Sequence, residues 1–150
     1  MNIDPKFFDY EIYAIYKAVN EVLGRETWSI VWRSGEILLD LIWDELGLKL
    51  DMDYIEALKR VAEWLKKVGY IDEIELIKED EGNIRYVMKE PVIADGAKKL
   101  IDEGYVPPHI STSLLFATLK RFGYKVEMVG DPIFMGDKVV EKWRLVPIMD

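Results

Sequence analysis

The stretch that decides the fold is HISTSLLFATLKRFGYKVEMVGDPIFMGDKVVEKWRLVPIMD, residues 109–150. From Leu114 onward, apolar residues recur at three- and four-residue steps, which is the spacing of an amphipathic helix. Gly123 then stands where a helix C-terminus favours a residue that can adopt positive φ. Residues 124–129 and 139–146 alternate between apolar and polar side chains around the segment GDPIFMGD. They therefore predict two strands joined by a glycine-rich turn.

The upstream sequence predicts four further helices and a second hairpin. The first helix begins at Asp4-Pro5, because an acidic N-cap followed by proline is a helix start signal, and it ends at Gly24. The other helices are expected over 26–46, from Asp51 or Asp53 to Gly69, and over 93–103, and the hairpin strands over 70–78 and 84–89. This order predicts one α+β domain, residues 1–150, with two layers. A four-stranded antiparallel sheet of two hairpins forms one layer, and helices pack on one of its faces.

The helix expected over residues 26–46 is apolar on more than one side. Its main stripe includes Trp32, while Ile37 and Leu41 lie on a different face. Such a helix is buried, or it is shared between the core and a subunit interface. Gly35 costs about 1 kcal/mol relative to alanine in a helix, so it indicates a close approach of another backbone. We expect a homodimer formed through the first two helices, with Gly35 at the contact, because one sheet can cover only one apolar face.

The composition excludes several classes of site and partner. The 150 residues include no cysteine and one histidine, which excludes disulfides, iron–sulfur clusters, thiol catalysis and multi-histidine metal sites. A net charge of −8 makes nucleic acid a poor partner. No apolar run approaches the roughly 18–20 residues of a membrane span, and no signal peptide is recognisable, so a cytoplasmic location is expected. The absence of glutamine is typical of a protein from a hot environment.

Residues 114–146 combine a helix that contains small residues, the Gly123 stop, a valine-rich strand and a Met135-Gly136-Asp137 turn before the last strand. In these features the segment resembles the C-terminal half of the 4-vinyl reductase domain, whose superfamily also contains the small subunits of the TRAPP membrane-tethering complex. The resemblance implies the ligand-binding, nitric-oxide-signalling/TRAPP-like fold, which commonly dimerises through its long early helices. Members of the superfamily are described as binding small apolar molecules or acyl chains, or as scaffolds for partners.

The chain departs from that family at the metal site. Many relatives hold zinc with cysteines on both sides of the Gly-Asp turn, and the corresponding positions here are Pro132 and Val140. The resemblance therefore implies no zinc site, and we expect neither a metal nor a cofactor. His109 has two interpretations: a lone acid/base group or ligand contact, or a residue at the helix entry, where one of residues 111–113 caps the first turn.

The aromatic side chains are the main candidates for a binding site. Ligand pockets are mostly apolar with a few polar groups, so the five tryptophans predict either such a pocket or an aromatic core. The candidate ligand-binding residues are Trp32, Trp43, Phe116, Phe134 and Trp143. No phosphate loop, dinucleotide fingerprint or nucleophile elbow occurs, so no catalytic residue is assigned.

These observations favour a non-catalytic binding module for a small apolar molecule, acting as a sensor or carrier. One alternative is a dimeric protein-interaction scaffold of the tethering-subunit type, and another is a reductase of a tetrapyrrole-like pigment. The helix and hairpin over residues 54–89 also suit a winged-helix DNA binder. The three acids at 79–81 on the hairpin tip and the net charge of −8 oppose that interpretation.

Overall fold

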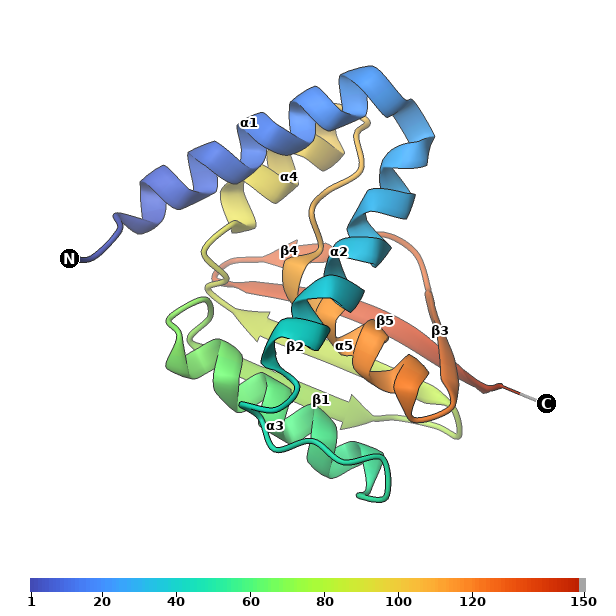
Figure 1. Cartoon of the computed structure of the whole chain (residues 1–150). Helices are drawn as coiled ribbons and strands as arrows, with labels where there is room; N and C mark the ends of the chain where they lie inside the picture. The colour runs from blue at the N-terminus through green and yellow to red at the C-terminus, as the bar shows by residue number, and fades with distance from the viewer. Residues whose placement is uncertain (149–150) are drawn as a thin grey trace.

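An antiparallel sheet forms one layer of the structure, a computed structural model that describes residues 1–148 (Figure 1). Its strands are β1 (Glu73–Lys78), β2 (Asn83–Lys89), β3 (Tyr124–Met128), β4 (Ile133–Met135) and β5 (Lys138–Pro147). The strand order is β1-β2-β5-β3, and β4 also pairs with β5. β3 lies against the second half of β5 and β4 against the first half, so both occupy the same edge of β5.

The α+β class and the antiparallel pairing are confirmed, but the prediction of four strands was wrong. The segment predicted as a long turn contains β4, so the described sheet has five strands. Met135 pairs with Lys138, which leaves only Gly136 and Asp137 as the turn. A two-residue hairpin turn needs positive φ, and Gly136 has a φ of 62°. The apolar residues before this turn are therefore free to pair with β5 as an edge strand.

One face of the sheet is buried and the other is exposed. Buried side chains alternate along the two central strands, as the two-residue period of a strand requires. They are Ile84, Tyr86 and Met88 on β2, and Val139, Glu141, Trp143 and Leu145 on β5. Arg85, Lys142 and Arg144 are exposed on the opposite face.

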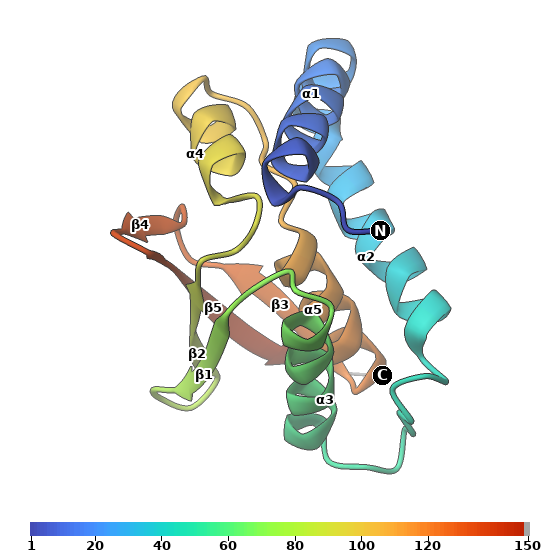
Figure 2. The same cartoon turned by 90° about the vertical axis from the view of Figure 1, so that its left-hand side faces the viewer.

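Helices cover the buried face in two tiers (Figure 2). Within residues 1–148 the helices are α1 (Pro5–Leu23), the short 3-10 helix η1 (Gly24–Glu26), α2 (Thr27–Ile42), α3 (Tyr54–Lys67), α4 (Ala94–Asp102) and α5 (Ile110–Arg121). α3 and α5 lie next to the sheet, and α2 packs on the outer side of α5. α1 packs on α4, beyond the end of the sheet where β4 lies. α2 therefore separates α5, the most buried helix, from the solvent.

The predicted helix boundaries agree with the structure to within a few residues. Asp4 is the N-cap of α1, and one of its carboxylate oxygens accepts a hydrogen bond from the backbone N–H of Lys6. α2 ends at Ile42, four residues before the predicted end at Leu46, and the chain continues through turns. None of the helices in residues 1–148 is long and apolar enough to cross a membrane.

Gly35 permits the close approach of α2 to α5. A Cβ atom on Gly35 would lie 2.4 Å from the carbonyl oxygen of Ser113, closer than real Cβ contacts come. The prediction of a close backbone approach is thereby confirmed, with the approaching backbone in the same chain. The prediction that Gly35 lies at a dimer contact was wrong, because Gly35 is buried against α5.

Candidate functional site

A continuous series of aromatic rings runs from the surface of α2 into the core. The rings of Trp28 and Trp32 stack with centroids 5.5 Å apart, and Trp32 stacks on Phe116 of α5 at 5.1 Å. Phe116 meets Trp143 of β5 edge-on at 4.9 Å, and Trp143 lies 4.7 Å from Tyr86 of β2. Trp28 and Trp32 are half-buried, whereas Trp143 and Tyr86 are fully buried. The series therefore connects a solvent-accessible surface with the centre of the sheet.

A groove of about 530 Å³ opens beside the outer part of this series, between α2, α5 and β3. We call it the α2–α5 groove. Its apolar lining comprises Trp32, Phe116, Ala117, Tyr124, Val126 and Ile148. Glu36 and Lys120 lie at its rim with the carboxylate and ammonium groups 3.7 Å apart, and Lys125 also lines it. The groove has the size and the lining of a small-molecule site, which is mostly apolar with a few polar groups.

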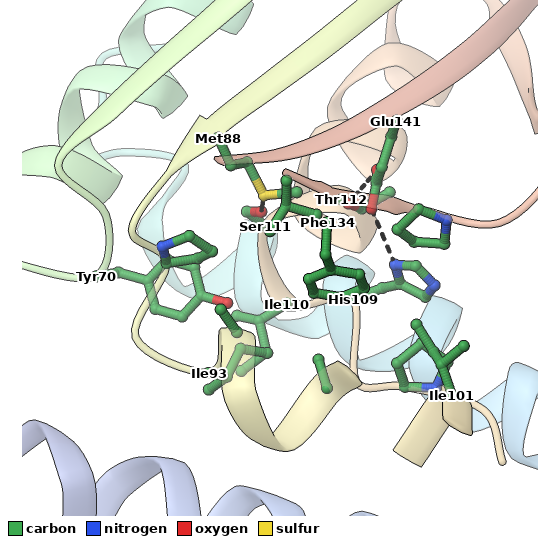
Figure 3. A pocket seen from close by; sticks show the side chains of 16 residues that line it. Tyr70, Met88, Ile93, Ile101, His109, Ile110, Ser111, Thr112, Phe134 and Glu141 are labelled. Carbon is green, nitrogen blue, oxygen red and sulfur yellow. Dashed lines mark hydrogen bonds and ion pairs between the residues drawn. The ribbon is translucent and has the colours of Figure 1, made fainter. Parts of the chain in front are cut away.

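A buried polar network lies at the inner end of the aromatic series, around Glu141 of β5 (Figure 3). The side chain of Glu141 is only 2% exposed. Its Oε1 accepts hydrogen bonds from Thr112 Oγ1 at 2.7 Å and from Trp143 Nε1 at 3.0 Å, and its Oε2 lies 3.3 Å from His109 Nδ1. Two hydrogen bonds and the contact with Nδ1 leave this buried carboxyl group well satisfied. The network joins β5 to the start of α5.

His109 occupies an unusual backbone conformation at the start of α5. It is the N-cap residue and adopts the left-handed region, with φ 47° and ψ 47°, which non-glycine residues rarely do. Its ring stacks against Trp28 with centroids 5.5 Å apart and planes inclined by 19°. The predicted capping by residues 111–113 was wrong, because no side chain caps this helix. The orientation of His109 is set instead by Glu141 on one edge and Trp28 on one face.

Glu141, the partner of His109, was not among the residues predicted from the sequence. Glu141 belongs to the alternating series Val139, Glu141, Trp143 and Leu145, whose members all point to the buried face. An acid at a buried position of that series could have indicated a buried carboxylate in need of donors. The sequence does not show which donors meet it, because α5 comes onto this face only in the folded chain.

A small cavity of about 40 Å³ lies next to the His109–Glu141 pair. Tyr70, Met88, Ile93 and Phe134 are among its lining residues (Figure 3). A cavity needs roughly 10–15 Å³ to hold one water molecule. This cavity therefore has room for a few waters, and it is far smaller than the α2–α5 groove.

The structure brings three of the five candidate residues together and separates the other two. Trp32, Phe116 and Trp143 contact one another in the aromatic series. Phe134 of β4 lines the small cavity instead. Trp43 lies just after α2, 6.4 Å from Phe122 and under the guanidinium of Arg121. Ligand binding by these five side chains stays a prediction.

Comparisons with known proteins identify the fold. No family model and no curated protein matches the sequence. Trafficking protein particle complex subunit 3 from Naegleria fowleri, whose structure is described as covalently bound to palmitic acid, is similar with a TM-score of 0.68 and 11% identity over 97% of both chains. An H-NOX protein from S. oneidensis is similar with a TM-score of 0.58 and 14% identity over 91% of this chain and 74% of that chain. An oxygen-binding H-NOX domain related to soluble guanylate cyclases has a TM-score of 0.55 and 15% identity, over 100% and 77%.

These similarities confirm the TRAPP-like, nitric-oxide-signalling fold that the sequence resemblance implied. Identities this low concern the fold alone, and membership of the 4-vinyl reductase family stays a prediction because no family model matches.

Haem is mentioned for the H-NOX family among the structural neighbours, but within residues 1–148 no enclosed haem pocket surrounds His109, the one histidine of the sequence. The side chain of His109 is 4% exposed and lies between a cavity of about 40 Å³ and an open surface groove of about 360 Å³, and neither encloses a macrocycle. Its ring is also held between Glu141 and the tryptophans of α2. Within residues 1–148, no group of three acidic or histidine side chains is arranged to hold a metal ion.

Proposed function

We propose that this chain is a non-catalytic binding module that holds a small apolar molecule in the α2–α5 groove and acts as a sensor or carrier. The observation that carries the proposal is the groove itself, about 530 Å³ and lined mainly by aromatic and aliphatic side chains. Burial of apolar ligand surface contributes about 25 cal/mol per Å² to binding, so a groove of this kind can hold a ligand without a catalytic residue. The polar groups at its rim would orient the ligand.

An acyl chain with an acidic end is the ligand class that we favour. Its hydrocarbon part would lie on Trp32 and Phe116, and its carboxylate near Lys120 or Lys125. The structural neighbour from Naegleria fowleri is described as covalently bound to palmitic acid, which supports this class. This chain has no cysteine, so no thioester can form and we propose non-covalent binding.

Isothermal titration calorimetry with laurate tests the proposal. We expect saturable binding to the natural chain and a loss of about tenfold or more in affinity for Val126→Trp, which places a bulky ring in the groove. Val146→Trp is the matched control, because Val146 is an exposed β-strand valine that does not line the groove. An absence of saturable heat, or equal affinity in the two variants, would reject the α2–α5 groove as the site.

A dimeric interaction scaffold is the second candidate, and the distribution of side chains on α1 favours it. The buried residues of α1 are polar, Asp9 and Asn20. Large apolar residues point outward instead: Phe7, Tyr10, Ile15 and Val22 on α1, and Ile30, Ile37 and Leu41 on α2. Val22 is 81% exposed and Leu41 is 76% exposed. Apolar surface of this extent marks an interaction site, and twofold self-association is the commonest way to cover it.

Light scattering distinguishes this candidate from a monomeric module. We expect twice the chain mass of 17.5 kDa at micromolar concentration, and a monomer for Leu41→Glu. Leu50→Glu is the matched control, because Leu50 is similarly exposed but lies outside α1 and α2. A monomeric natural chain, or a dimer that both variants retain, would reject the contact through the first two helices.

A further inference from the structure

A second groove, of about 360 Å³, adjoins the small cavity and shares Ile101, Pro107, His109 and Pro132 with it. We call it the His109 groove. The start of α2, the connector before α5 and the turn between β3 and β4 form it. Arg25, Trp28, Pro107, His109, Asp131 and Pro132 are among its lining residues. Trp32 and Phe116 do not line it, so it is distinct from the α2–α5 groove.

The free ring nitrogen of His109 faces away from Glu141 and toward this groove. Nδ1 contacts Glu141, which lines the small cavity but not the His109 groove. Nε2 lies on the opposite edge of the ring (Figure 3), and none of the hydrogen bonds found within residues 1–148 involves it. A side chain that is more than nine-tenths buried therefore presents one unpartnered polar atom.

Glu141 fixes the orientation of the imidazole. Its Oε1 accepts from Thr112 and Trp143, and its Oε2 lies 3.3 Å from His109 Nδ1. Nδ1 is therefore engaged at the carboxyl group, and Nε2 is the ring nitrogen that a ligand in the groove can reach. With a hydrogen on Nε2, this atom is a donor for an anion.

Stability alone does not account for this arrangement. The left-handed conformation is strained for a non-glycine residue such as His109. A buried polar contact is often no more stabilising than apolar residues of the same volume. Backbone strain and a buried histidine–carboxyl contact at one residue, next to an open groove, are typical of a binding site.

We propose that the His109 groove binds a small monocarboxylate with an aromatic or apolar body. The carboxylate accepts from Nε2–H of His109 and from the guanidinium of Arg25, and the body packs on Trp28 and Pro132. Asp131 adds one negative charge to the rim, which disfavours ligands with a second carboxylate. This site is separate from the proposed function, because it lies in a different groove and takes an acid with a compact body instead of a long acyl chain.

Nitrogen NMR of the single histidine tests the proposal directly. In ¹⁵N-histidine-labelled protein, titration with benzoate is expected to shift the Nε2 resonance saturably. Benzyl alcohol, which has the same ring without the charge, is expected to bind about tenfold more weakly, since hydrogen bonds between charged groups are the stronger ones. The absence of a saturable shift, or equal binding of the two compounds, would overturn it.

Arg25→Gln tests the charged contact that we assign to the ligand carboxylate, and variants outside the His109 groove serve as controls. Arg25→Gln is expected to weaken benzoate binding about three- to tenfold, whereas Arg33→Gln, an exposed arginine of α2 outside the groove, is expected to leave it unchanged. Val126→Trp, which fills the other groove, is expected to bind benzoate normally. Equal affinity in Arg25→Gln and Arg33→Gln would contradict the assigned contacts.

Discussion

Gly35 shows how a single residue sets the distance between two helices. A Cβ there would meet the backbone of Ser113, which belongs to the most buried helix and has no flexible end that could move aside. We expect Gly35→Ala to lower the free energy of unfolding by about 1–3 kcal/mol, despite the better helix propensity of alanine. Urea unfolding measures this, with Ser29→Ala on the exposed face of α2 as the control. An unchanged or higher stability would show that α2 and α5 can separate without cost.

Asp9 is a buried acid on α1 whose titration makes stability depend on pH. Burial raises the pKa of Asp9, the backbone N–H of Gly96 offsets part of that rise, and nearby Asp95 adds to it. The folded-state pKa therefore lies above the unfolded-state pKa, and the folded protein binds more protons between the two values. Stability from this group is fully present below the unfolded-state pKa and is lost as pH rises through the folded-state pKa.

We expect Asp9→Asn to remove this component of the pH dependence and to be more stable than the natural chain at neutral pH. Urea unfolding between mildly acidic and neutral pH measures both effects. Glu11→Gln, at an exposed position of the same helix, is the control and should leave the pH profile unchanged. A profile for Asp9→Asn that parallels the natural one would contradict the assignment.

At the scale of elements, polar contacts attach α1 to the rest of the chain. Asn20 donates from Nδ2 to the carbonyl oxygen of Val106 at 2.9 Å and accepts from its N–H at 2.8 Å. Lys17 and Tyr13 both donate to Glu103 just after α4, at 2.8 and 2.5 Å, and these hydrogen bonds lower the pKa of Glu103. Because the contacts are specific but few, α1 is the helix that depends most on individual hydrogen bonds.

We expect Asn20→Ala to destabilise the protein by about 1–3 kcal/mol, because it leaves the buried N–H and carbonyl of Val106 without partners. Hydrogen exchange should show faster exchange across α1 than across α5. Glu21→Ala, at the neighbouring exposed position, serves as the control. Uniformly faster exchange over the whole chain would mean that α1 does not open separately.

At the scale of the whole molecule, the proposed dimer links stability to concentration. If the outward apolar residues of α1 and α2 are covered by a second copy, unfolding releases two chains and the Tm rises with protein concentration. We expect a rise of about 3–5 °C for a hundredfold increase in concentration. Scanning calorimetry measures it, and Leu41→Glu should show no such dependence. A constant Tm in the natural chain would place the scaffold hypothesis in doubt.

Much of the fold was predictable because its signals are local. The start of α1 at Asp4-Pro5 and the stop of α5 before Gly123 depend on residues a few positions apart. The alternation along β5 depends only on which side of one strand each residue occupies. β4 was not predicted, because the apolar pattern of a three-residue edge strand is too short to be distinguished from that of a turn.

By itself, the sequence determined the five long helices, four of the five strands, their order and the α+β class, since apolar periodicity records which side of each element is buried. Only the tertiary structure decided which elements meet there. It joined Glu141 to His109, set Gly35 against Ser113, and placed Trp43 and Phe134 apart from Trp32, Phe116 and Trp143. The physical reason is that a sequence pattern shows that a side chain is buried but does not show which residues surround it. Grooves and polar networks arise where surfaces of distant elements pack, and their shape is a property of the packing.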